Sequence, residues 1–522
     1  MDTFLSKYQD VITGTLATFD RIIFKGHLLK FFPKGAFAHF LFQQNVLLKD
    51  FGTYAKSKTD ELKAHLEQFA AEAGRPLIYL NKASTARQGN SKEDQARAVA
   101  ARDGITTGLI CIFSVVEPCH AFGIRSNRAT HKLEVVREYR KCLHYYLYYF
   151  DPELGFLHIR LQSWFPFEIQ VYINGREWLA RQLDQRGVAY VRYDNKLTQI
   201  ADLPLAQELC VQFEHRAWPR LLDALAKKVN PHLPLLRQAL GAGYYWVIDQ
   251  AEYATDVFFR DRASLEALVP DLVAVSSTAL SAEDILGFLG RKLHGNFKGE
   301  VFTNLKRRPQ GWRVKHAMKR NSIKWYDPAN ILRIETTINN PREFRVLRVL
   351  DTPDGKQRRW LPMGKGVANF WRYAQVGAQS NARYLEALAN VQPVGKAITE
   401  LDRLCQPRIH QGKRAARFQP ISAMDCQLFA AVLRGEHAIH GFRNKDLIAQ
   451  LYPSPAQSAA ECRRRSARGS RLIAKLRGHG LIAKVKDSRL YRVTDRGCQL
   501  MSAALHCRNK EFPAAVFQTT AA

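Results

Sequence analysis

Apolar and polar residues in the first part of the chain follow strand and helix patterns in alternation. Residues 16–25, "LATFDRIIFK", have a strand pattern, helical spacing follows at 35–48 and 60–73, and "PLIYL" predicts a short strand. A helix near 94–102 precedes "GLICIFSVVEPC", an apolar strand that ends at Glu117. Strands that alternate with helices predict an α/β fold for this region.

Aromatic residues are concentrated in the next segment, 141–195. It contains "CLHYYLYYF", "FLHIRLQSWFPFEIQVYING", a helix at 176–185 and the strand "VAYVRYDN". Such aromatic side chains either pack a sheet or stack bases, and packing is the favoured interpretation. A long helix is then predicted over 205–228, followed by a strand pair in "YYWVIDQAEYATDVFFRD".

The segment 306–326, "KRRPQGWRVKHAMKRNSIKWY", contains no carboxylate and reads as several strand-like pieces. Its cations would track a phosphate backbone, with Trp312 and Trp325 as platforms for bases. The alternative is an ordinary solvated face. The predicted nucleic-acid-binding residues are Lys306, Arg307, Arg308, Arg313, Lys315, Lys319, Arg320 and Lys324.

Two strands across an Asp-Pro turn, "NSIKWYDPANILRIETTINNPREFRV", place Tyr326 near Glu335. A tyrosine beside a carboxylate that binds a metal would suit strand cleavage, with the phenol attacking phosphorus and the ion stabilising the developing charge. Over about 15 residues this passage resembles the strands of phage and plasmid replication initiators. Tyr326 and Glu335 are therefore the candidate catalytic residues, and the alternative is that Tyr326 packs while Arg333 or Lys324 neutralises Glu335.

Several carboxylates lie in or beside apolar strands, where a charge is costly unless it is paired or bound to a cation. The strand pair at 244–261 is similar to the opening hairpin of RNase H-like nucleases and transposases, a resemblance that implies acidic ligands for divalent ions. Mg²⁺ or Mn²⁺ would be the cofactor. Pairing with basic side chains, such as Asp20 with Arg21, is the alternative, and the candidate metal ligands are Asp20, Glu117, Glu252 and Asp256.

The end of the chain predicts a separate small module. Helical patterns at 425–434 and 444–451 are followed by a basic helix, and the strands 481–485 and 490–493 then form a hairpin. The segment resembles the winged helix-turn-helix of MarR-like regulators in its "LRGHGLI" turn and "YRVTDRG" exit. That resemblance implies a third helix in the major groove and a wing on the backbone. The expected contacts are Arg464, Arg468, Arg471, Lys475 and Arg489.

Composition supports a polyanionic partner, because 78 Lys plus Arg against 48 Asp plus Glu give a net charge of +30. Without a long apolar run, nucleic acid is favoured over a membrane, and DNA over RNA.

Nine scattered cysteines never form a C-x-x-C pair, which argues against a zinc site and a disulfide framework. "MGKGVANFWRY" lacks Walker spacing, so no nucleotide cofactor is expected. The start does not match a signal peptide, which predicts a cytoplasmic protein.

These patterns predict an α/β and α+β multidomain protein. We expect an α/β domain at 1–135, an aromatic-rich α/β segment at 136–235, a basic α+β domain with antiparallel strands at 236–392, a basic linker at 393–415, a winged helix-turn-helix at 416–508 and a tail at 509–522. The whole chain also resembles a bacterial protein family through "FDRIIF", "GREWL" and "RIETTINNP", a likeness that implies no chemistry.

Two functions follow from these residues. The first is a DNA-processing protein of a mobile or replicating element, such as a nuclease, transposase or replication initiator. The second is a non-enzymatic DNA- or RNA-binding regulator or RNA-associated factor. The oligomeric state, a homodimer included, stays open.

Overall fold

The computed structural model describes the chain except for residues 82–90, 194, 292–299, 309–310, 353–354, 390–393, 411, 435–436, 438–440, 486–487 and 509–522. The predicted tail lies outside the described residues. The described chain is mixed α/β and divides into two compact units. The first comprises Met1–Val269 and Ala282–Ala387, and the second comprises Pro270–Ser281 and Leu388–Ala522.

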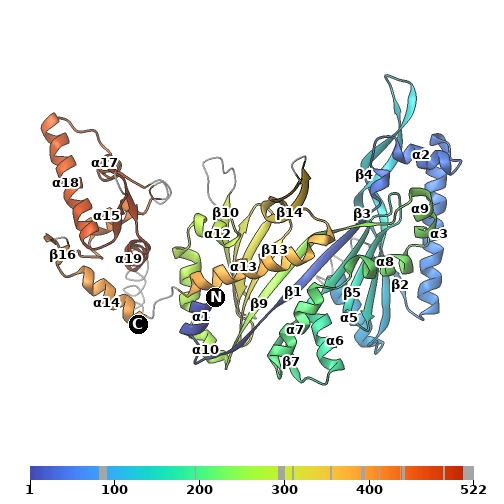
Figure 1. The fold of residues 1–522 in the computed structure, drawn as a ribbon, viewed down its shortest axis with the longest axis horizontal. Helices are drawn as coiled ribbons and strands as arrows, with labels where there is room; N and C mark the ends of the chain where they lie inside the picture. Colours follow the sequence, from blue (N-terminus) through green and yellow to red (C-terminus); the bar gives the residue numbers. More distant parts are fainter. Residues whose placement is uncertain are drawn as a thin grey trace. The chain divides into compact units, whose positions relative to one another are not determined.

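The first unit is built on one eleven-stranded sheet, ordered β10-β11-β12-β13-β9-β1-β6-β5-β4-β3-β2 (Figure 1). Every pairing is antiparallel except that of β2 with β3. Its strands are β1 (Ile12–His27), β2 (Leu77–Tyr79), β3 (Gly108–Asn127), β4 (Lys132–Asp151), β5 (Gly155–Gln162), β6 (Ile169–Asn174), β9 (Tyr245–Phe259), β10 (Val301–Arg308), β11 (Gly311–Met318), β12 (Asn321–Tyr326) and β13 (Ile331–Ile338). One sheet thus contains strands from all three segments predicted within 1–392.

Helices of the first unit surround this sheet. They are α1 (Asp2–Lys7), α2 (Ala36–Gln43), α3 (Phe51–Glu72), α5 (Lys92–Arg102), α6 (Gly175–Gln185), α7 (Leu203–Glu214), α8 (Trp218–Val229), α9 (Leu233–Leu240), α10 (Arg262–Glu266), α12 (Ala282–Phe288) and α13 (Phe370–Leu388). Two hairpins stand outside the main sheet, β7 (Tyr190–Tyr193) with β8 (Lys196–Ile200), and β14 (Arg345–Thr352) with β15 (Gly355–Pro362).

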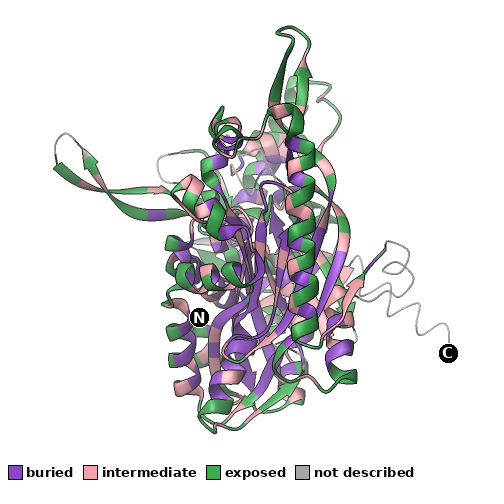
Figure 2. Ribbon diagram, turned by 90° about the vertical axis from the view of Figure 1, so that its right-hand side faces the viewer, coloured by how far each residue is buried: buried purple, intermediate pink, exposed green. Residues whose placement is uncertain are grey.

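One face of the sheet is apolar because alternate side chains of its strands point to the same side. Helices α8 and α13 cover it: Phe370 stacks on Phe19 at 4.3 Å between ring centroids, and Trp218 stacks on Phe24 at 5.2 Å. Each such pair contributes about 0.5–1.5 kcal/mol beyond the area it buries. The purple strands in Figure 2 show that much of the sheet is buried.

The second unit packs helices and two short hairpins around its own core. The elements are α11 (Val269–Ala274), α14 (Val394–Leu404), β16 (Arg408–His410), β17 (Lys413–Ala415), α15 (Ala423–Val432), α17 (Asn444–Leu451), α18 (Ala459–Gly478), β18 (Ile482–Lys484), β19 (Tyr491–Val493) and α19 (Asp495–His506). Phe418, Phe429, Leu447, Ile473 and Leu476 belong to this core. Helix α17 ends at Leu451 as predicted, but Asn444, expected as its cap, is its first residue and Arg443 is the N-cap. The segment 393–415, predicted as a linker, contains α14 and the β16–β17 hairpin.

Three further expectations about local structure were wrong. The predicted strand pair at 244–261 is the single strand β9, which has no turn and pairs with β1 along its length and with β13 over residues 251–258. The likeness to an RNase H-like hairpin therefore fails. The predicted helix 205–228 breaks into α7 and α8, because Pro219 begins a new helix. Strand β3 continues ten residues past Glu117, with Pro118 tolerated where β2 no longer pairs.

Candidate nucleic-acid interface

A bulge in β1 brings two charged residues to one face of the sheet. The register between β1 and β9 slips between Phe19 and Ile22, so Asp20 and Arg21 together oppose Glu252. Such a bulge interrupts the alternation of side chains and changes the face of the sheet to which they point. Bulges are frequent beside active sites. Asp20 and Arg21 therefore both lie on the face opposite α13.

Arg333 of β13 joins the carboxylates on this face. Its Nε donates to Asp256 Oδ1 at 2.5 Å and its NH2 to Oδ2 at 2.8 Å, while its NH1 donates to Asp20 Oδ2 at 3.2 Å. Arg176 of α6 approaches Asp256 from above the sheet, with NH1 2.8 Å from Oδ2. We call this group the charged centre: Asp20, Arg176, Asp256, Tyr326, Arg333 and Glu335.

The charged centre is almost fully removed from water. The side chain of Asp256 is 0% exposed and that of Arg333 is 1% exposed. Burial by itself would raise the pKa of Asp256, but the neighbouring Arg176 and Arg333 hold that pKa below its usual value. Removing one partner from such a group leaves an uncompensated buried charge, which is far costlier than the pairing is favourable.

Tyr326 lies at the solvent-side end of the charged centre. Its hydroxyl donates to Glu335 Oε2 at 3.1 Å and accepts from Arg333 NH1 at 3.4 Å. Lys324 Nζ is 2.6 Å from Glu335 Oε1, and Lys196 Nζ lies 5.9 Å from the centroid of the Tyr326 ring. Burial, ahead of the neighbouring charges, raises the pKa of Tyr326 well above its usual value, so the phenol is neutral at pH 7.

Residues that the sequence did not single out hold this arrangement in place. Gly175 starts α6 so close to β1 that a Cβ there would meet Phe19 O at 2.3 Å, and this approach brings Arg176 over Asp256. Asn195 Nδ2 donates to Asp20 Oδ1 at 2.6 Å and in turn accepts from Asn174. The strand-to-helix junction in "YINGREW" was visible in the sequence, but its partner across the sheet was not.

From Tyr326 outward, the same face carries a series of cations. Lys324 of β12 pairs directly with Lys315 of β11, and Arg313 of β11 pairs directly with Lys306 of β10. Lys324 is 20% exposed, Arg313 and Lys315 are half-buried, and Lys306 is exposed. Burial and then neighbouring cations lower the pKa of Lys315. We call Lys306, Arg313, Lys315 and Lys324 the basic face.

Of the remaining predicted contacts of this segment, Arg308 lies on the same side of β10 as Lys306, where it adds to the lowering of the pKa of Arg313 by burial, and the others lie elsewhere. Arg307 points to the other side of β10, where its guanidinium is 5.4 Å from the Trp312 ring, and Arg308 is exposed near the end of the strand. Lys319 and Arg320 are exposed at the β11–β12 turn. Trp325 was wrongly expected to stack bases: it is 0% exposed, because it points into the apolar core.

The four candidate metal ligands do not gather at one point. Glu117 is separate from the others and binds Lys92, Tyr146 (2.7 Å) and Arg160 (3.1 Å). Burial would raise the pKa of Glu117, but bonds from Lys92 and Tyr146 lower it to about 2.

The other three lie near the charged centre, where Asp20 and Asp256 already have cationic partners and Glu252 accepts from Gln250 at 2.8 Å. Among the described residues no group of three or more His, Cys, Asp or Glu could hold a metal ion. A divalent ion would have to displace Arg333 or Lys324, so the donor set does not fit one as it stands.

In the second unit, α18 presents an arginine-rich surface. Arg464, Arg468 and Arg471 are exposed, as is Arg489 after β18. Lys475 does not share that surface, because its Nζ is 3.0 Å from Asp425 Oδ1 and 3.9 Å from the Phe418 ring centroid. The expected phosphate contact at Lys475 is thus an internal ion pair.

Comparison with known proteins finds no relative. No protein-family model matches the chain, and neither curated proteins nor solved structures include a similar one. All nine cysteines are free thiols in the structure. Within the described residues, no single helix is long and apolar enough to cross a membrane, and one bent pair, Arg262–Thr278 with Ala282–Phe288, meets that test by length and composition.

Proposed function

We propose that this protein binds nucleic acid, DNA in preference to RNA, along the basic face. The observation that carries the proposal is the direct pairing of like charges, Lys306 with Arg313 and Lys315 with Lys324, of which Lys324 is already paired with Glu335. Like charges directly opposite each other on neighbouring strands are destabilising. A phosphate backbone would relieve that repulsion, and each neutralised phosphate would release counterions.

The second unit supports the same function. We propose that α15, α17, α18 and the β18–β19 hairpin form a winged helix-turn-helix like that of MarR-like regulators. In that module the third helix lies in the major groove. Helix α18 would then bring Arg464, Arg468 and Arg471 to base edges or phosphates, while Arg489 near the hairpin would contact backbone.

The basic face is tested with Lys306→Ala combined with Lys315→Ala, which removes one member of each like-charge pair. Because two phosphate contacts are lost, we expect weaker binding to every DNA sequence. The slope of the logarithm of the binding constant against the logarithm of salt concentration should fall in magnitude by about two. Affinity is measured by fluorescence anisotropy over a salt series.

Lys49→Ala with Lys56→Ala is the matched control, since it removes two exposed cations beside or within α3. Equal affinity and salt slope for the two double variants would refute the proposed basic face.

A second candidate function is strand cleavage by Tyr326, favoured by its hydrogen bond to Glu335. The phenol oxygen would attack phosphorus while Glu335 accepts the phenol proton. The bond from phosphorus to the sugar oxygen would break, that oxygen would take a proton from water, and Lys324, which is 20% exposed, would stabilise the phosphate charge. Since burial raises the pKa of Tyr326, this chemistry depends on the neighbouring base.

Tyr326→Phe tests this candidate. Because the variant keeps the ring but lacks the nucleophile, we expect it to bind DNA normally and to form no covalent protein–DNA adduct on a denaturing gel. Glu335→Gln should slow adduct formation by roughly 10²–10⁴-fold, the contribution of a general base.

Single-stranded, duplex and hairpin DNA are each tried with and without Mg²⁺ or Mn²⁺. Absence of adduct and cleavage on all of them would leave a non-enzymatic binding protein.

A further inference from the structure

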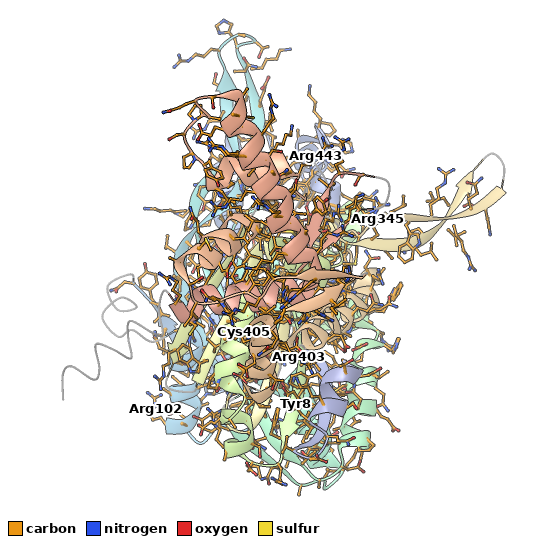
Figure 3. All side chains as sticks on the ribbon, turned by 90° about the vertical axis from the view of Figure 1, so that its left-hand side faces the viewer. Tyr8, Arg102, Arg345, Arg403, Cys405 and Arg443 are labelled. Atoms are coloured by element: carbon orange, nitrogen blue, oxygen red, sulfur yellow. The ribbon has the colours of Figure 1, made fainter. Side chains whose placement is uncertain are left out.

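The β14–β15 hairpin is a ribbon that belongs to no larger sheet. Its strands pair in unbroken register from Arg345 opposite Pro362 to Thr352 opposite Gly355. The ribbon leaves the core where Met363 N donates to Phe344 O at 2.8 Å, and it then projects away from the first unit (Figures 2 and 3). An isolated two-stranded hairpin is marginally stable in water at best. A projecting hairpin of this length therefore suggests a binding partner that would stabilise it.

Cations lie on both faces of this ribbon. Arg348 and Arg359 oppose each other directly on one face, and Arg358 lies opposite Val349 on the other. All three arginines are exposed, as are Arg345 and Lys356. The pairing of Arg348 with Arg359 repeats the like-charge pairing of the basic face, although Arg348 also donates to Asn369 Oδ1 and Asp351 lies opposite Lys356.

Apolar side chains are exposed beside these cations. Leu347 is 39%, Val349 57% and Trp360 52% exposed, and Leu347 pairs directly with Trp360. The guanidinium of Arg372 lies 5.3 Å from the Trp360 ring centroid and keeps the indole on the surface. Exposed apolar residues on an isolated ribbon promote aggregation unless a partner covers them.

We propose that the β14–β15 ribbon enters the major groove of duplex DNA, an inference that rests on the proposed nucleic-acid binding. The groove is about 12 Å wide and admits a two-stranded ribbon. Strands of eight residues extend about 26 Å at ~3.3 Å per residue, enough to follow the groove over several base pairs. Cations on both faces reach the phosphates of both groove walls, while Leu347, Val349 and Trp360 contact base edges such as thymine methyl groups.

The test is Arg358→Ala with Arg359→Ala in the full chain, compared with the Lys49→Ala, Lys56→Ala control. We expect the ribbon variant to bind duplex DNA roughly tenfold more weakly or worse, with a salt slope reduced by about two. Its thermal midpoint should be unchanged or higher, since a like-charge pair is removed. Protection of guanine N7, which faces the major groove, should be lost at the ribbon's contact site in the variant.

The possible outcomes distinguish a failure of this inference from a failure of the proposed nucleic-acid binding. Unchanged duplex affinity in the ribbon variant, alongside weaker binding by Lys306→Ala with Lys315→Ala, would overturn the ribbon alone. If the ribbon variant loses affinity only for single-stranded DNA of the same sequence, the inference is also overturned. The ribbon would then stack on unpaired bases instead of entering a groove. A parent protein that binds no DNA would remove the proposed function and this inference together.

Discussion

Replacing Arg333 by alanine should destabilise the first unit by about 3–5 kcal/mol, the cost of breaking a buried ion pair by removing one partner. The change leaves Asp20 and Asp256 in a nearly dry interior with too few cations, because Arg176 and the nearby Lys196 still act on Asp256 but the ion pair from Arg333 to both carboxylates is lost. Urea unfolding followed by tryptophan fluorescence measures the loss. Arg333→Lys should give an intermediate loss, since a single ammonium cannot replace the two-pronged bond to Asp256.

The matched control is Arg260→Ala, which breaks a surface pair. Arg260 is 64% exposed and lies 3.2 Å from Asp261. Exposed pairs of this kind contribute about 0–1 kcal/mol. Equal effects of the Arg333 and Arg260 changes would mean that water reaches the charged centre, against the burial described above.

The second large effect is expected on affinity. Replacing Arg464, Arg468 and Arg471 of α18 together by alanine should weaken binding of the full chain to duplex DNA by several kcal/mol, at about 1–3 kcal/mol for each base-reading contact. Because all three side chains are exposed, the thermal midpoint of the second unit should stay the same. Affinity is measured at two salt concentrations, and the same triple change to lysine separates base reading from charge.

Lys475→Ala is the control on the same helix. Since Lys475 pairs with Asp425 and covers Phe418, its loss should lower stability and leave affinity nearly intact. If Lys475→Ala weakens binding as much as the triple change does, then the DNA-contacting surface of α18 has been placed wrongly.

Local sequence patterns predicted many of the elements. Strand-like patterns identified β11, β12 and β13, and helical spacing identified α5, α6 and α17 close to their observed ends. These predictions succeed because the side-chain periods of strand and helix are properties of the local backbone. The basic character of β10–β12 and of α18 could also be predicted, since lysine and arginine residues are identified directly from the sequence.

Local patterns failed where an element's length depends on distant partners. The fifteen residues of β9 looked like two strands because polar residues interrupt their middle, yet pairing with β1 and β13 on its two sides keeps the strand continuous. Glu117 looked like a strand end, but pairing with β4 carries β3 through Pro118. Tertiary pairing overrode local preference in both cases.

The sequence by itself determined the residue types, their alternation within each strand and helix, and the excess of positive charge. Only the tertiary structure decided which charges meet. Asp20 reaches Arg333 across 313 residues because β1, β9 and β13 are neighbours in the sheet and a bulge turns Asp20 toward them. Burial then decides what those charges do. In a dry interior Asp256 must pair with arginine, whereas the basic side chains on β10 and β14 remain exposed and can bind an anion.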